Sequence, residues 1–222
     1  MPTLYGAPVS PFVRKTMVAL AEKGIAYEHD PVLPAVAPAE FKRISKEVSP
    51  LGRIPAYRDG DLTLADSSVI IAYLERVKPS PPLYPSETRD YTRALWFEEF
   101  GDGGLTPIIG GKIFFQKLVG PMLFKQPTDE AVVNKAINEE LPPLFDYLEG
   151  ELGSGDWLVG GRFSVADIGV ATDFAQATFV GLSPDAKRWP KLAAYVGRVL
   201  GRPSFADAIG KAKAMLSAMG IK

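Results

Sequence analysis

The chain has 222 residues, of which 46% are hydrophobic and 23% are charged, so it can bury a sizeable core. Its 25 Lys and Arg residues nearly balance 26 Asp and Glu residues, and the net charge of −1 lacks the basic excess that phosphate backbones attract. Cysteine is absent, which excludes disulfides, thiolate metal sites and a cysteine nucleophile. We therefore expect a globular protein that does not bind nucleic acid.

A metal site and a membrane segment are also not predicted. His29 is the only histidine and lies in a predicted strand, away from any carboxylate motif, so metal dependence is not expected. The first eight residues have the pattern of a strand rather than a signal peptide, and no apolar run is long enough to span a bilayer. The expected location is the cytoplasm, with no membrane partner.

The first third of the sequence alternates short strand patterns with helical patterns. These occupy residues 3–6, 11–24, 27–33, 38–46, 54–58, 61–64 and 66–77. The dipeptide Asp59-Gly60 separates two of the strand patterns and is typical of a two-residue hairpin turn. We predict a small α/β domain over residues 1–77.

A proline-rich stretch follows this domain. Residues 78–85 carry four prolines, which favour an extended connector and forbid a continuous helix, so we place a linker at residues 78–87. The remainder, residues 88–222, is predicted to be an all-helical domain. Its helical patterns cover about 88–100, 107–118, 129–152, 165–179, 190–200 and 204–218.

One of these helices has a clear start signal. Ser164-Val-Ala-Asp167 places a hydroxyl at the N-cap and a carboxylate at N3, which is the pattern of a capping box. Such a box initiates a helix, so we expect Asp167 to be structural rather than a catalytic acid or base.

Four segments, taken in order, resemble the cytosolic glutathione S-transferase family. They are Leu4–Lys15 at the first strand–helix turn, Ser49–Pro55 before the hairpin, Leu64–Leu74 and Ser164–Asp167. Each is modest alone, but four in this order and spacing are specific, and the resemblance covers nearly the whole chain. It implies a thioredoxin-like α/β N-terminal domain that binds glutathione, followed by an all-α C-terminal domain that builds the pocket for a second substrate.

The resemblance also implies a glutathione site. The proline that matches Pro55 is cis in the family, which lets Ile54 offer its N–H and C=O to the cysteinyl part of glutathione. Ser67, at a helix N-terminus, would bind the γ-glutamyl carboxylate, and Asp66 would face the α-amino group. Without the resemblance, Asp66 or Ser67 could simply cap the helix, and both roles are compatible.

Two cations are candidates for the glycyl carboxylate of glutathione. Arg53 is favoured because it directly precedes Ile54 in the motif, whose backbone is the edge expected to pair with glutathione. Lys42 is the alternative. With Arg43 and Lys46, Lys42 could equally form a solvated helix face.

Ser10 stands where the serine-type classes, such as phi, theta and zeta, place the hydroxyl that bonds the glutathione sulfur. Ser10 followed by Pro11 is also a typical N-cap and N1 pair, but a capping hydroxyl still has its own proton to donate. Tyr5 is the rival, because other classes use a tyrosine near the end of the first strand. When the sequence is aligned with those classes by the Pro and Arg that follow, Tyr5 stands one residue before the position of their tyrosine. In a strand, an offset of one residue turns a side chain to the opposite face.

We therefore expect a glutathione transferase in which glutathione is a co-substrate and no metal takes part. The electrophile pocket should be apolar and lie between the domains, with candidates Phe12, Trp96, Phe97, Ile108, Phe114 and Phe115. The alternatives are a glutathione-dependent cis–trans isomerase of maleyl compounds and a non-catalytic glutathione-binding protein of the same fold. The resemblance further implies a homodimer, while the sequence does not identify the electrophile.

Overall fold

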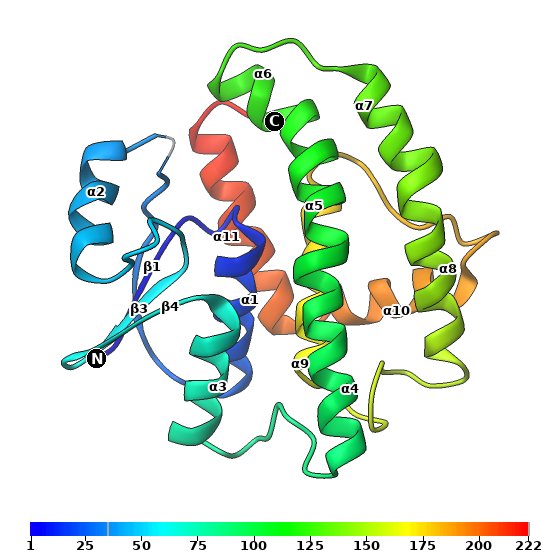
Figure 1. Ribbon diagram of the computed structural model, residues 1–222, viewed down its shortest axis with the longest axis horizontal. Coiled ribbons are helices and arrows are strands. Elements are labelled where there is room, and N and C mark those ends of the chain that lie inside the picture. Colours follow the sequence, from blue (N-terminus) through cyan, green and yellow to red (C-terminus); the bar gives the residue numbers. More distant parts are fainter. Residues whose placement is uncertain (35, 222) are drawn as a thin grey trace. The chain divides into compact units, whose positions relative to one another are not determined.

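The computed structural model describes residues 1–34 and 36–221, without the side chains of Arg43 and Ser45 (Figure 1). By its internal contacts the chain forms two compact units. The first contains residues 1–82 and 203–221, and the second contains residues 83–202. The final helix therefore belongs with the first unit, although the sequence patterns grouped it with the helical domain.

A four-stranded sheet forms the centre of the first unit, with strand order β2-β1-β3-β4. Its strands are β1 (Thr3–Tyr5), β2 (Glu28–Asp30), β3 (Ala56–Asp59) and β4 (Leu62–Ala65). β1 pairs with β2 in parallel and with β3 antiparallel, and β3 and β4 form the predicted hairpin. The α/β prediction is confirmed, although β2 is shorter than the predicted run over residues 27–33.

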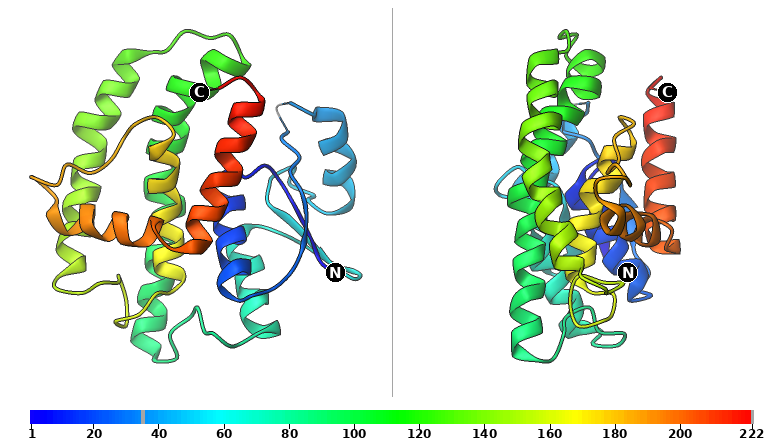
Figure 2. Two further views of the ribbon diagram at one scale, coloured as in Figure 1. Left: turned by 180° about the vertical axis from the view of Figure 1, so that it is seen from behind. Right: turned by 90° about the vertical axis from the view of Figure 1, so that its right-hand side faces the viewer.

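Helices cover both faces of this sheet (Figures 1 and 2). They are α1 (Pro11–Glu22), α2 (Pro38–Glu47), α3 (Ser67–Val77) and α11 (Pro203–Ala218). α1 packs against α3 and α11, whereas α2 packs on the opposite face, where Phe41 and Ile44 form a cluster with Val32, Val48 and Ala56. Because strand side chains alternate between faces, Tyr5 and Ala56 point toward α2 and their neighbours Leu4 and Tyr57 point toward α1.

Lys23, which directly follows α1, holds the segment of chain that follows α3. Its ammonium group is buried and donates to the carbonyls of Lys78 at 2.7 Å and Pro81 at 3.0 Å. It also forms an ion pair with Glu75 at 2.6 Å. A buried charge with this many acceptors is well compensated, so Lys23 ties the start of the proline-rich connector to α1.

The second unit is helical, as predicted. Its helices are α4 (Thr88–Glu99), η1 (Phe100–Leu105), α5 (Thr106–Ile108), η2 (Ile109–Val119), α6 (Gly120–Leu123), α7 (Glu130–Lys135), η3 (Ala136–Glu140), α8 (Leu141–Leu152), α9 (Val165–Thr178) and α10 (Pro190–Leu200). The predicted break between residues 100 and 107 was wrong, because the chain stays helical from residue 88 to 123. The π-helical segments η1 and η2 carry the backbone through this region, and Pro107 stands in the first turn of α5.

α9 is the central helix of the second unit and packs against α4, η1, η2 and α10 (Figure 2). Its residues 165–177 are all buried. Two glycines let α9 approach α4 and η1 closely. A Cβ on Gly101 would lie 2.7 Å from the Gly169 carbonyl oxygen, and a Cβ on Gly169 would lie 2.9 Å from the Glu98 Cα. The helix crossing therefore depends on the absence of side chains at both positions.

The predicted capping box begins α9. The Asp167 carboxylate accepts the N–H of Ser164 at 2.9 Å and the N–H of Leu158 at 3.1 Å. Burial nevertheless raises the pKa of Asp167 to about 6, although these hydrogen bonds oppose the shift. Asp167 thus joins the helix start to the preceding loop, which agrees with a structural role.

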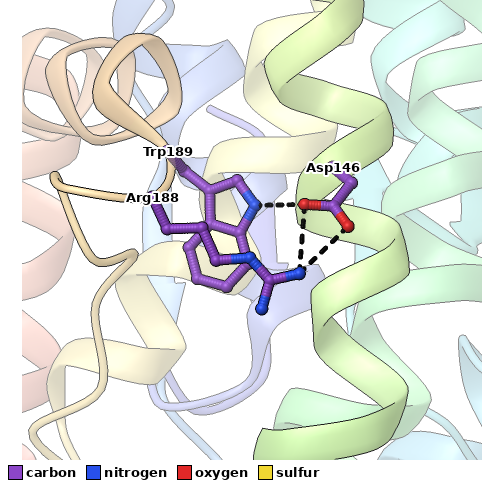
Figure 3. A network of polar contacts seen from close by, with 3 residues as sticks. All are labelled: Asp146, Arg188 and Trp189. Carbon is purple, nitrogen blue, oxygen red and sulfur yellow. Dashed lines mark hydrogen bonds and ion pairs between the residues drawn. The ribbon is translucent and has the colours of Figure 1, made fainter.

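Two carboxylates of α8 hold the start of α10, and Figure 3 shows the contacts of one of them, Asp146. Asp146 accepts the indole N–H of Trp189 at 2.6 Å and pairs with Arg188 at 3.1 Å, while the Arg188 guanidinium lies 4.3 Å from the centre of the Trp189 ring. Glu149 accepts the N–H groups of Lys191 and Leu192 in the first turn of α10. These contacts satisfy helix N–H groups that otherwise have no partner within the helix.

We predict that Gly169→Ala destabilises the fold by about 1–3 kcal/mol, because the added methyl group would overlap the backbone of α4. Gly150→Ala is the matched control, since Gly150 is an exposed residue of α8 and a Cβ at this position would have nothing within 4 Å. The control should gain about 0.5 kcal/mol from helix propensity. Urea unfolding measures both, and equal stability of the two variants would contradict the proposed tight crossing.

We also predict that Asp167 makes the unfolding free energy depend on pH. Its folded pKa of about 6 exceeds the unfolded value of 3.8, so the folded state binds more protons between these values. The contribution of Asp167 to stability should therefore fall as pH rises from about 4 to 6, by roughly 3 kcal/mol. Comparing wild type with Asp167→Asn at pH 4 and pH 7 tests this, and a difference that stays constant would show that the group titrates normally.

Candidate glutathione site

A hollow of about 100 Å³ opens in the first unit where three segments meet. These are the first turn of α1, the loop before β3 and the junction of β4 with α3. The lining residues are Phe12, Leu51, Arg53, Ile54, Pro55, Ala65, Asp66 and Ser67. Six of these were predicted from the sequence, whereas Leu51 and Ala65 were missed. Leu51 is 74% exposed. The one sequence signal that it lines the hollow was an apolar side chain in a turn, between Pro50 and Gly52.

The Ser49 hydroxyl group closes the loop before β3. It donates to the Arg53 carbonyl at 2.6 Å and accepts the Arg53 N–H at 3.1 Å. Ser49 itself is fully buried, whereas the Arg53 side chain is exposed at the hollow. The Ile54–Pro55 peptide bond that follows is cis, as the resemblance implied. Ser49 therefore fixes the backbone on which Arg53 and Ile54 stand.

Asp66 and Ser67 form the other wall. The Asp66 carboxylate caps α3 by accepting the N–H groups of Ser68 at 2.9 Å and Val69 at 3.2 Å. Its φ of 87° is unusual for a residue other than glycine and costs on the order of 1–3 kcal/mol, which the surrounding structure must offset. Ser67 is buried at the first position of α3, where the helix dipole favours negative charge. This wall combines a carboxylate with an anion-attracting helix end.

Ser10 immediately precedes α1 and is not itself part of the lining, although Phe12 two residues later is. Its hydroxyl makes no capping hydrogen bond to the helix. The backbone makes the contacts at this turn instead, because the Ser10 N–H donates to Ala7 at 3.0 Å and its carbonyl accepts from Arg14 at 3.0 Å. The hydroxyl is therefore not needed to begin α1.

The turn that carries Ser10 lies against the wall of the hollow. A Cβ on Gly6 would lie 2.6 Å from Val13 Cγ2 and 2.9 Å from Ile54 Cβ, and the φ of Gly6 is 132°. Only glycine fits both this space and this backbone conformation. Gly6 thus brings the strand–helix turn into contact with the Ile54 edge.

Tyr5 and Lys42 stand elsewhere. The Tyr5 ring packs against the cluster beneath α2, with the Arg58 guanidinium 6.0 Å from its centre. Lys42 is exposed on α2 and does not line the hollow, while the Arg43 side chain lies outside the described residues. Of the two predicted cations, Arg53 is the one that the hollow contains.

The electrophile candidates other than Phe12 lie on the helical run of the second unit. Phe97 and Phe114 are buried in its core, and Ile108 and Phe115 are partly buried. Trp96 is 50% exposed and donates its indole N–H to the Tyr147 hydroxyl at 2.8 Å. Their assignment to an electrophile pocket stays a prediction.

Metal-binding and membrane-spanning features are not found in the described part of the chain. Residues 1–34 and 36–221 hold no group of three or more His, Asp or Glu side chains suited to a metal ion. No helix among these residues combines the length and apolar character needed to cross a membrane.

Comparisons with known proteins identify the family. Models described as glutathione S-transferase N-terminal and C-terminal domains match residues 4–82 and 131–198. A probable glutathione S-transferase of rice (Oryza sativa subsp. japonica) is 29% identical over 90% of this chain and 92% of its own length. Glutathione S-transferase 1 of maize (Zea mays) is 33% identical over 74% and 75%, respectively. The chain belongs to the glutathione S-transferase family.

The fold agrees with solved glutathione S-transferases. Glutathione S-transferase-I bound with lactoylglutathione superposes with a TM-score of 0.84, at 26% identity, over 95% of this chain and 99% of that chain. This chain is also similar to proteins with other names: FtsZ-localized protein A of Caulobacter vibrioides is 26% identical over 82% of this chain and 79% of its own length. Membership alone therefore does not select one activity.

We predict that Ser49→Ala weakens glutathione binding by about 1–2 kcal/mol, because the Arg53 N–H and carbonyl would lose their buried partner and the loop would loosen. Calorimetric titration with glutathione and with γ-glutamylcysteine, which lacks the glycyl group, measures the effect. The loss should be larger for glutathione. An equal loss for both ligands would show that Ser49 does not act through Arg53.

Proposed function

We propose that this protein is a glutathione transferase that activates the thiol of glutathione and adds it to an apolar electrophile. The observation that carries the proposal is the hollow, because one cavity gathers a cation, an extended backbone edge and a helix N-terminus. Arg53, Ile54 and Ser67 supply these three features. They complement the glycyl carboxylate, the cysteinyl peptide and the γ-glutamyl carboxylate of an extended tripeptide.

In the proposed binding mode, Ile54 exchanges backbone hydrogen bonds with the cysteinyl residue. Ser67 binds the γ-glutamyl carboxylate through its N–H and hydroxyl, and the Asp66 carboxylate attracts the α-ammonium group. Arg53 pairs with the glycyl carboxylate in preference to Lys42, because Arg53 lines the hollow. The cysteine sulfur would then face the turn between β1 and α1, where the Ser10 hydroxyl donates a hydrogen bond to the sulfur.

The required stabilisation of the thiolate is modest. A free thiol has a pKa of about 8.5, so only about 3% is ionised at pH 7. Lowering this pKa by two units needs about 2.7 kcal/mol of preferential thiolate binding. One charge-assisted hydrogen bond supplies about 1.5–3 kcal/mol and a helix N-terminus about 0.3–1 kcal/mol. The hydroxyl of Ser10 and the start of α1 are therefore sufficient, and no general base is needed.

The chemical step is then a simple displacement or addition. The thiol proton passes to solvent and the sulfur lone pair forms the new carbon–sulfur bond. In a substitution the leaving group departs with its bonding electrons, and in an addition the electron pair of the broken π bond takes up a proton from solvent. Phe12 offers an apolar surface beside the site. The proposal assigns Ile108 and the aromatic candidates of the second unit, Trp96 among them, to holding the electrophile.

A non-catalytic binding protein is the second candidate function, and one comparison favours keeping it. FtsZ-localized protein A carries a name that describes a location rather than a transfer reaction. The maleyl isomerase alternative has less support, because the Ser-Ser-Cys-Ser motif of that class is replaced here by Ser10-Pro-Phe-Val13. The resemblance also implies a cytoplasmic location and a homodimer, and sedimentation equilibrium can test the homodimer.

Turnover and binding separate these candidates. Steady-state assays with glutathione and 1-chloro-2,4-dinitrobenzene should give glutathione-dependent product, and calorimetry should show glutathione binding. Binding without turnover on a broad panel of electrophiles would favour the non-catalytic protein. Absence of binding would contradict both functions.

We predict that Ser10→Ala and Ser10→Gly both raise the pKa of the bound thiol by about two units, which lowers the thiolate at pH 7 by more than tenfold. Because the hydroxyl makes no capping bond, both variants should keep their unfolding free energy within about 0.5 kcal/mol. Ultraviolet titration of the bound thiolate measures the shift. An unchanged thiol pKa in both variants, with glutathione still bound, would return the role to Tyr5 or to the backbone.

A further inference from the structure

His29, the only histidine of the chain, lies on β2 beside the first strand. Its Nε2 atom is 2.9 Å from the Gly6 carbonyl oxygen. A carbonyl oxygen can only accept a hydrogen bond, so Nε2 carries the proton and donates it. His29 therefore holds the first peptide of the turn that leads to Ser10.

Both polar backbone groups of Gly6, its N–H and its carbonyl, are bonded by residues of β2. Its N–H donates to the Asp30 carbonyl at 2.8 Å, and its carbonyl accepts from His29. The same residue is wedged against Val13 and Ile54, where no side chain would fit. A shift of Gly6 would therefore move the Ser10 turn relative to the Ile54 edge.

The surroundings of His29 favour a neutral donor. Burial lowers the pKa of His29, and the Lys211 ammonium lowers it further, whereas the bond to Gly6 and the Asp30 carboxylate oppose the change. The Tyr27 ring lies edge-on to the imidazole at 6.2 Å. These surroundings favour the uncharged imidazole, which acts through its hydrogen bond rather than through a charge near the sulfur.

We propose that His29 is a positioning residue for thiol activation, which acts by fixing Gly6 and, through the turn, the hydroxyl of Ser10. This inference rests on the proposed function of Ser10. His29 does not contact glutathione in this account. Loss of its hydrogen bond should therefore alter the bound thiol while leaving the binding of the γ-glutamyl and glycyl ends nearly unchanged.

Two amide variants test the proposal. In His29→Gln the amide nitrogen extends about as far from the backbone as Nε2 of the imidazole. In His29→Asn it extends only about as far as Nδ1, so the two variants differ mainly in the reach of the donor. We expect His29→Asn to raise the pKa of the bound thiol by about one unit and to lower kcat about fivefold at pH 6.5. Its KM for glutathione should change less than about threefold, and His29→Gln should stay within about threefold of wild type in both constants.

Several outcomes would overturn the proposal. A wild-type thiol pKa in His29→Asn would do so, and so would equal impairment of the Gln and Asn variants with unchanged melting temperatures. Ser10→Ala serves as the reference: a thiol pKa that shifts in Ser10→Ala but not in His29→Asn rejects His29 alone. No shift in Ser10→Ala rejects the proposed function of Ser10 itself.

A measurement on the wild-type protein does not depend on how the variants fold. Nitrogen-15 NMR of the imidazole gives a single set of signals, because the chain has one histidine. We expect the neutral tautomer with the proton on Nε2 at pH 7. The tautomer with the proton on Nδ1 could not donate to Gly6 and would contradict the proposal.

Discussion

The contact of Gly6 with Val13 and Ile54 is the constraint on which the site depends. A side chain at this position would overlap both neighbours, so the backbone of the β1–α1 turn can approach the segment that carries Pro55 only through glycine. This approach sets the distance between the residue proposed to activate the thiol and the edge proposed to bind the peptide. His29 and Asp30 then fix the same glycine from the side of β2.

The remaining parts of the hollow are held by a similar device, in which one polar side chain fixes the backbone of a binding segment. Ser49 closes the loop before β3, and the Asp66 carboxylate closes the first turn of α3 despite its unfavourable φ. In each case the bonded groups belong to the backbone, which leaves the Arg53 side chain at the hollow for a ligand. In the proposed binding mode, specificity for a tripeptide arises from the spacing of these segments rather than from a strong overall charge, since the net charge is only −1.

Sequence reasoning predicted the fold well where local patterns and tertiary structure agree. The hairpin at Asp59-Gly60 and the capping box at Asp167 are local signals, and both are present. The predicted break between residues 100 and 107 was wrong because a glycine in this segment serves helix packing: Gly101 meets Gly169, which lies far away in the sequence. The placement of α11 on α1 was missed for the same reason, because no local pattern states which unit a helix will pack against.

The site shows the same division. The segments at Arg53–Pro55 and Asp66–Ser67 could be predicted because short motifs carry them, and the hollow contains them. The roles of Ser49 and His29 could not be predicted from the sequence, since a buried hydroxyl and a lone histidine have no distinctive pattern until their partners are known. Leu51 was missed because exposure of an apolar side chain depends on the turn around it.

The central claim is that this turn places the Ser10 hydroxyl at the sulfur of a tripeptide held by the hollow. A crystal structure of the protein with bound glutathione tests it most directly. The account predicts the sulfur within about 3.5 Å of the Ser10 hydroxyl, the cysteinyl backbone paired with Ile54 and a carboxylate at the start of α3. A sulfur that points away from Ser10, or a tripeptide bound outside the hollow, would contradict the account.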